Sequence, residues 1–318
     1  MLRLEGAVTR LRIPFGVAPE LVVLGGALLV GGCGLLLGLP AVVPDGPALR
    51  FVEHHYFSPL VVALVLQAIM VAFGRARGGP DQRWHSLVPA LLLVPVTILV
   101  HFNLKAWMPL VHRRLFDVEL IGTDRGLEPL VTLLFFLRRA IAAPLDRLGV
   151  PVDAIYHGAF VGMFFVALSA HAVFDSLRGL RRVVLGACFI LLAGGLCYWV
   201  LPARGPFLFR VGESRLADAA QADMLGRFQE LVRTGRPPPG YFAAPLAAMP
   251  SLHTAHATFF TLVAYRRLRW LALPFGLILC WILIEAVAAG WHYLLDLPAG
   301  MLLAVGTVWL LDRTLPDA

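Results

Sequence analysis

Long apolar segments alternate with short polar ones along most of this chain. A helix needs about 20 mostly apolar residues to cross a bilayer, with a range of roughly 17–25. Eight segments approach that length, at about 20–42, 57–74, 86–104, 154–174, 183–201, 252–265, 270–290 and 296–312. The pattern therefore predicts an all-α polytopic membrane bundle of about eight transmembrane helices.

The composition excludes an ordinary soluble protein. The 318 residues are 59% hydrophobic and 15% charged, whereas soluble domains are about 45–50% apolar and about 25% charged. In a membrane protein a net charge of +7 reflects topology, so we expect no nucleic-acid partner. The four cysteines lie inside apolar segments without a C-x-x-C pair, which favours buried thiols over disulfides or zinc.

Arginines in the polar connections predict the orientation of the chain. Basic residues concentrate at the N-terminus (Arg3, Arg10, Arg12) and in loops 75–85, 175–182 and 266–269. With eight spans these four regions lie on one side together with the C-terminus, and cytoplasmic loops are enriched in Lys and Arg. We expect cytoplasmic termini and place the protein in a bacterial inner membrane.

The remaining long connections are expected on the opposite, extracytoplasmic side. We treat 1–318 as one integral membrane domain, with N-terminal spans at 20–104 and a core of further spans at 154–312. Residues 105–153 contain the apolar but arginine-interrupted stretch EPLVTLLFFLRRAIAAPLDRL, which indicates a helix in the interface rather than a span. Residues 202–250 form a second outer loop, rich in proline and glycine.

This topology brings distant ionisable residues to one depth at the outer surface. They are Lys105, Arg204, His253, His292 and Asp296, each at the outer end of a predicted span. Ionisable groups at or inside a bilayer are costly, so they are candidates for function.

The spacing within this set suggests roles. His292 and Asp296 are four residues apart and share a helix face, so the carboxylate can fix one imidazole tautomer. Ser251 precedes an apolar run as an N-cap, and a helix N-terminus attracts an anion near His253. Arg204 can bind phosphate through two hydrogen bonds. The alternatives are ordinary capping and interfacial placement for each residue.

Two of these segments resemble known motifs. PSLH at 250–253, followed by HYLLD at 292–296, resembles the second and third motifs of the type 2 phosphatidic acid phosphatase (PAP2) superfamily. Arg204 in CYWVLPARGP matches the arginine of the first motif, but Cys197 stands in the lysine position. Glu285 and Ala286 replace the Ser-Arg that opens the third motif.

These departures resemble the inositol phosphorylceramide synthase and sphingomyelin synthase branch. The segment HFNLKAWMPL and the later Asp117 are also similar to an upstream segment of the inositol phosphorylceramide synthases. The resemblance implies a six-helix PAP2-like core and transfer of a phospho-headgroup from a phospholipid donor to a ceramide or diacylglycerol acceptor. It implies a phosphohistidine on His292, with Asp296 and His253 as its catalytic partners.

The resemblance also assigns substrate binding and leaves alternatives. Arg204, Ser251 and Lys105 are expected to bind substrate, without a cofactor or metal. A metal site of His253, His256, His292 and Asp296 is the less favoured interpretation, because HxxH is unlike the i,i+4 zinc pair. A lipid-phosphate phosphatase and a non-catalytic transporter or scaffold remain alternatives, and the roles of His256, Glu285 and the His54–His55 pair stay open.

Overall fold

The computed structural model describes residues 19–73, 87–112, 114–150 and 152–315, and these ranges contain helices and loops without a strand. The N-terminal arginines and loop 75–85 lie outside the described residues. The described α-helices are α1 (Pro19–Leu36), α2 (Gly46–Val52), α3 (Ser58–Ala72), α4 (Val88–Val111), α5 (Asp117–Gly126), α6 (Glu128–Arg147), α7 (Val152–Phe174), α8 (Leu177–Val200), α9 (Arg215–Thr234), α10 (Leu252–Arg267), α11 (Arg269–Ala288) and α12 (Asp296–Thr314). The prediction of an all-α membrane bundle is confirmed.

The eight predicted spans correspond to helices. A π-helical turn, η1 (Glu53–Phe57), joins α2 and α3 into one helical segment. Among the described residues, five helical segments are long and apolar enough to cross a membrane: α2–α3, α4, α7, α8 and α11. α1 is a shorter apolar helix. The chain is therefore an integral membrane protein.

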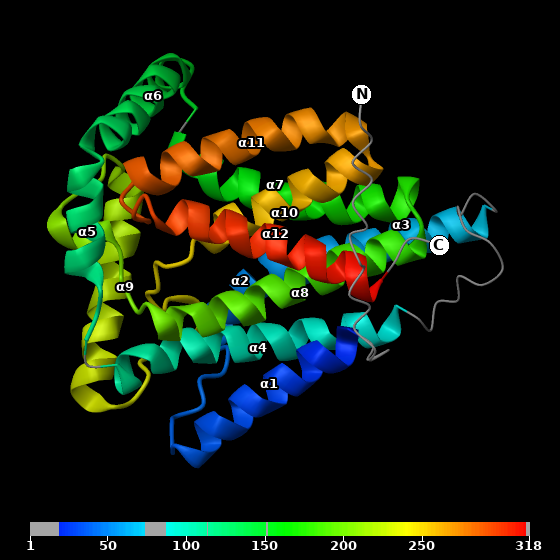
Figure 1. Cartoon of the computed structure of the whole chain (residues 1–318), viewed down its shortest axis with the longest axis horizontal. Coiled ribbons are helices and arrows are strands. Elements are labelled where there is room, and N and C mark those ends of the chain that lie inside the picture. Colours follow the sequence, from blue (N-terminus) through cyan, green and yellow to red (C-terminus); the bar gives the residue numbers. More distant parts are fainter. Residues whose placement is uncertain (1–18, 74–86, 113, 151, 316–318) are drawn as a thin grey trace, which may run out of the picture.

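Helix α10 lies in the middle of the bundle. It packs against α7, α8, α11 and α12, while α3 packs on α7 and α4 on α8 (Figure 1). Glycines allow the close approach of α8, because a Cβ at Gly186 would lie 2.1 Å from the Phe259 ring and one at Gly194 would lie 2.3 Å from Leu252. This packing places the start of α10, with His253, beside the ends of its neighbours.

The arginine-rich loops that the structure describes meet at one end of the bundle. Asp312 near the end of α12 accepts hydrogen bonds from Arg182 and Arg266, and Asp175 after α7 accepts from Arg267 at 2.7 Å. At the opposite end, α5 and α9 cross the ends of the long helices (Figure 1). The two ends thus differ in architecture.

Helix α4 extends further than the sequence pattern predicts. It ends at Val111, so Lys105 lies inside the helix instead of beyond its outer end. The polar side chains in this part of α4 find partners in the segment before α2: Asn103 accepts from the Val42 amide at 2.7 Å and donates to the Val42 carbonyl at 2.8 Å. Because these groups are satisfied, the helix continues through a polar stretch.

A buried ion pair fastens α6 to α11. The Arg138 Nε donates to Glu285 Oε2 at 2.8 Å, and both side chains are buried. The opposite face of α6 leaves apolar side chains exposed, among them Phe136 at 63%. The expected helix is present, its place in the membrane interface stays a prediction, and Glu285 has a structural partner.

Replacing Arg138 with methionine should destabilise the protein by about 3–5 kcal/mol, because a buried carboxylate then loses its counter-charge. Replacing Glu285 as well, with leucine, should restore most of that loss, since no buried charge remains. Thermal unfolding of the detergent-solubilised protein measures both effects. Arg114→Gln in the exposed Arg114–Glu119 pair is the control and should cost less than about 1 kcal/mol. Wild-type unfolding of the single Arg138 variant would contradict this account.

Candidate active site

His292 lies in the turn between α11 and α12, and the turn holds one imidazole nitrogen in place. Its Nδ1 lies 2.9 Å from the Ala248 carbonyl oxygen and 3.2 Å from Asp296 Oδ2. A carbonyl oxygen can only accept, so Nδ1 carries the hydrogen and Nε2 keeps its lone pair. The ring is 7% exposed. The predicted His292–Asp296 contact is thus present, with a backbone carbonyl as a second acceptor.

Asp296 also holds the turn itself. Its Oδ2 accepts from the Tyr293 amide at 2.9 Å. The backbone of Gly290 has a φ of +74°, and a Cβ there would lie 2.2 Å from the Val211 carbonyl. Glycine is therefore required for the left-handed conformation and for the close approach of the neighbouring loop.

The start of α10 is joined to the start of α12. The Ser251 amide donates to the Asp296 carbonyl at 3.0 Å, and a Cβ at Gly300 would lie 2.4 Å from the Ser251 carbonyl. Ser251 is the predicted N-cap, since its side chain accepts from the Thr254 amide. It is fully buried and lines neither of the two cavities described below, so substrate binding by Ser251 stays a prediction.

His253 is in the first turn of α10, surrounded by rings. Its imidazole lies 4.2 Å from the Phe160 ring, 5.1 Å from the Tyr156 ring and 6.2 Å from the His157 ring, measured between centroids. His253 and His292 line a common cavity. The histidines of the two motifs therefore converge, as the sequence predicts.

Asp117 at the start of α5 connects the arginine segment to the histidine turn. Its Oδ1 accepts from the amides of Arg204 and Gly205 at 2.8 and 3.0 Å and from the Tyr293 hydroxyl at 2.8 Å. Its Oδ2 lies 3.3 Å from the Arg204 Nε. Asp117 is 3% exposed. One buried carboxylate thus positions Arg204 and the residue that follows His292.

Lys105 brings a second cation to the site from α4. Its Nζ lies 5.5 Å from the centre of the Tyr198 ring, and Tyr198 follows Cys197, the position where the PAP2-like first motif has lysine. Arg204 stacks over Phe228 of α9 at 5.6 Å. Both cations line the cavity that contains the two histidines.

This cavity, which we call the cationic cavity, has a volume of about 210 Å³. Among the described residues its lining includes no aspartate or glutamate. Its polar and aromatic lining residues are His55, Tyr56, His101, Lys105, Tyr156, His157, Tyr198, Arg204, His253, His256, Trp291 and His292. Arg204 is paired with Asp117 behind the wall, but the lining itself carries two cations and no carboxylate, which makes an environment for an anion.

His256 and the His54–His55 pair differ in their hydrogen bonds and in their position relative to the cationic cavity. His256 donates from Nδ1 to the Leu252 carbonyl at 2.9 Å, one turn back in its own helix, and its Nε2 lies 3.4 Å from the Ala187 oxygen. This geometry supports a packing role for His256. No group of three or more His, Cys, Asp or Glu among the described residues is placed to hold a metal ion. His55 lines the cavity, whereas His54 is exposed outside it.

Sequence reasoning missed several residues of this site, and three of them illustrate why. His157 and Tyr156 of α7 line the cavity, and the Tyr156 hydroxyl is buried without a partner in the described structure. An ionisable residue within a span was the available signal for His157. The third, Asp124 of α5, accepts from the Leu294 amide at 3.0 Å; nothing in its spacing indicates that contact.

Comparison with models of known protein families gives a match. A family model described as PAP2 superfamily covers residues 132–310, more than half of the chain. The matched range contains Arg204, His253, His292 and Asp296, whereas Lys105 and α5 precede it. No curated protein and no solved structure matches significantly.

Proposed function

Because the chain belongs to the PAP2 superfamily, we propose that it is a membrane lipid phosphotransferase. It moves a phospho-headgroup, such as phosphoinositol, from a phospholipid donor to the hydroxyl of a ceramide or diacylglycerol type of acceptor. Membership supports phosphatase or phosphotransferase activity. The observation that carries the proposal is the fixed tautomer of His292, which presents a lone pair at the wall of a cavity with two cations.

The first half-reaction forms a phosphohistidine. The Nε2 of His292 attacks phosphorus while the bond from phosphorus to the lipid oxygen breaks, and His253 gives that oxygen a proton. Asp296 stabilises the imidazolium that develops on His292. Arg204, Lys105 and the N-terminus of α10 stabilise the negative phosphoryl oxygens.

The second half-reaction uses the same groups in reverse. His253, now deprotonated, takes the proton of the acceptor hydroxyl, whose oxygen attacks the phosphorus. The bond between phosphorus and Nε2 breaks, and His292 returns to its neutral form. A lipid hydroxyl gives a new phospholipid, whereas water gives a free phospho-headgroup or phosphate.

The sequence departures favour transfer over simple dephosphorylation. Cys197 and Ala286 stand where the phosphatase-like motifs have lysine and arginine, as in the inositol phosphorylceramide synthase and sphingomyelin synthase branch. Lys105 supplies a cation beside Tyr198 from another helix. We place the site on the extracytoplasmic side of a bacterial inner membrane, with both termini cytoplasmic, because the described arginine loops gather at the other end of the bundle.

The test is acceptor dependence. Purified protein in mixed micelles with headgroup-labelled phosphatidylinositol should label a ceramide acceptor, and omission of the ceramide should lower donor consumption by about tenfold or more, since only slow hydrolysis remains. Labelled lipid product is separated by thin-layer chromatography. Equal donor consumption with and without acceptor, with all label in water-soluble products, would make the protein a phosphatase or phospholipase instead.

A further inference from the structure

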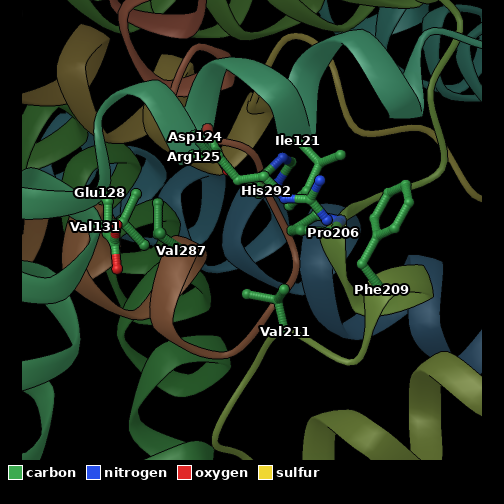
Figure 2. Close-up of a pocket in the computed structure, with 10 residues that line it drawn as sticks. All are labelled: Ile121, Asp124, Arg125, Glu128, Val131, Pro206, Phe209, Val211, Val287 and His292. Carbon is green, nitrogen blue, oxygen red and sulfur yellow. The ribbon is translucent and has the colours of Figure 1, made fainter.

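A second cavity reaches His292 from outside the cationic cavity. It has a volume of about 290 Å³ and lies between α5, α6, the end of α11 and the loop around Pro206 (Figure 2). We call it the side cavity. Among the described residues, His292 alone lines both cavities. His292 therefore lies in the wall between the two cavities.

The lining of the side cavity differs in charge from that of the cationic cavity. Besides His292, its polar residues are Asp124, Arg125 and Glu128, and the rest of its wall is apolar. Asp124 is 7% exposed and accepts from the Leu294 amide through Oδ1, while its Oδ2 takes no hydrogen bond from the described residues. Arg125 and Glu128 are exposed at the mouth, and neither forms an ion pair with a described residue. These groups are available to a ligand.

The chemistry of phosphorus assigns different directions to the parts of a donor lipid. The attacking atom and the leaving oxygen lie in line on opposite sides of phosphorus, and the three other oxygens lie in the plane between them. The acceptor must later enter from the side that the leaving oxygen vacated. In a phosphodiester, one in-plane oxygen carries the group that stays on phosphorus through both half-reactions. That group projects sideways from the line between His292 and His253.

We propose that the side cavity binds the retained headgroup of a phosphodiester donor, and that this headgroup is an uncharged polyol. The inference rests on the proposed function. The leaving and entering lipid oxygens occupy the cationic cavity with His253, and the retained headgroup occupies the side cavity. A phosphate monoester has no such group and leaves the side cavity empty.

The charged residues of the side cavity determine which kind of headgroup it can bind. Asp124 and Glu128 disfavour an anionic headgroup, and Arg125 disfavours a cationic one. Phe209 is the one aromatic residue among the described lining residues, whereas quaternary ammonium groups are recognised by cages of several rings. Hydroxyl groups can donate to the carboxylates and accept from the guanidinium. Burial, and then the charge of Asp296, raise the pKa of Asp124 to about 6, so near neutral pH it is mainly an acceptor.

The experiment compares donors in mixed micelles with ceramide as acceptor. The donors are phosphatidylinositol, phosphatidylcholine and phosphatidic acid, and donor consumption gives kcat/KM for each. Wild type should prefer phosphatidylinositol to phosphatidylcholine. The double variant Arg125→Gln/Glu128→Gln should lower kcat/KM for phosphatidylinositol by about tenfold and change that for phosphatidic acid by less than about twofold. Both substitutions are at exposed positions, so folding should be retained.

Two further variants sharpen the result. Val131→Trp narrows the side cavity, and Val131 does not line the cationic cavity. This variant should also lower kcat/KM for phosphatidylinositol alone. Glu119→Gln, on the same helix α5 but outside the cavity, is the matched control and should behave as wild type.

The outcomes separate this inference from the proposed function. The headgroup assignment is wrong if the side-cavity variants consume phosphatidylinositol as fast as wild type does. It is also wrong if their kcat/KM falls equally for all three donors. In both cases the transfer proposal stands. A wild-type preference for phosphatidylcholine also overturns the polyol assignment. If wild type consumes phosphatidic acid and neither phosphodiester, the transfer proposal itself fails, and the headgroup site with it.

Discussion

Replacing His292 with alanine should lower the turnover of donor lipid by roughly 10⁴-fold or more, because removal of a covalent nucleophile leaves only binding and electrostatic effects. The imidazole is already oriented through Nδ1, so the group that is lost is the Nε2 lone pair. The measurement is donor consumption at saturating acceptor, together with acid-labile phosphate on the protein after rapid quenching. His54→Ala is the matched control, since His54 is exposed and lines neither cavity.

A contrast with His253 makes this result specific. His253→Ala removes the proton donor and not the nucleophile, so a donor with a good leaving group, such as a nitrophenyl phosphodiester, should still phosphorylate His292. His292→Ala should fail with both kinds of donor. If the His292 variant turns over either donor at a wild-type rate, the nucleophile is another residue. If the activated donor does not rescue His253→Ala, His253 is not the general acid.

Replacing Asp117 with alanine should reduce activity by about 10²–10³-fold and stability by about 2–5 kcal/mol. The carboxylate accepts from two backbone amides and the Tyr293 hydroxyl, and it lies beside the Arg204 guanidinium. Its removal leaves buried donors without a partner, and it frees Arg204 and the His292 turn from their common anchor, where small displacements are costly to catalysis. Turnover and thermal unfolding measure the two effects.

Tyr293→Phe provides the graded comparison, because it removes one of these hydrogen bonds and keeps the ring. It should cost about 1 kcal/mol and only a small part of the activity. Asp117→Asn keeps the shape of the side chain but removes the charge beside Arg204. Its activity and stability should therefore lie between those of Tyr293→Phe and Asp117→Ala. An Asp117→Ala protein with wild-type turnover would show that α5 does not position the site.

The bundle was predictable because its signal is local. Each predicted span contains a helix, since twenty apolar residues in a row have few other structures available in a bilayer. Helices α10 and α12 are not among the candidate spans: α10 has 16 residues, and α12 carries Asp312 and Arg313 near its end. His256 and Thr258 point into the bundle, and Asp296 at the start of α12 belongs to the site.

The candidate site was only partly predictable. His292 with Asp296, and Ser251 with the first turn of α10, depend on short spacings that the sequence displays directly. The contact of Asp117 with Arg204 joins residues 87 positions apart, and that of Asp124 with Leu294 joins residues 170 apart. Such pairs depend on how α5 lies across the end of the bundle, and no periodicity along the chain records that orientation.

Lys105 is the only lysine in the chain, and it lines the cationic cavity. An amine-directed reagent small enough to enter therefore has one internal target, besides the N-terminal amine. Modification of that side chain, followed by mass spectrometry, reports directly whether the cavity is occupied. A bound phospholipid slows the labelling even when no turnover takes place, so affinity becomes measurable in variants that lack the nucleophile.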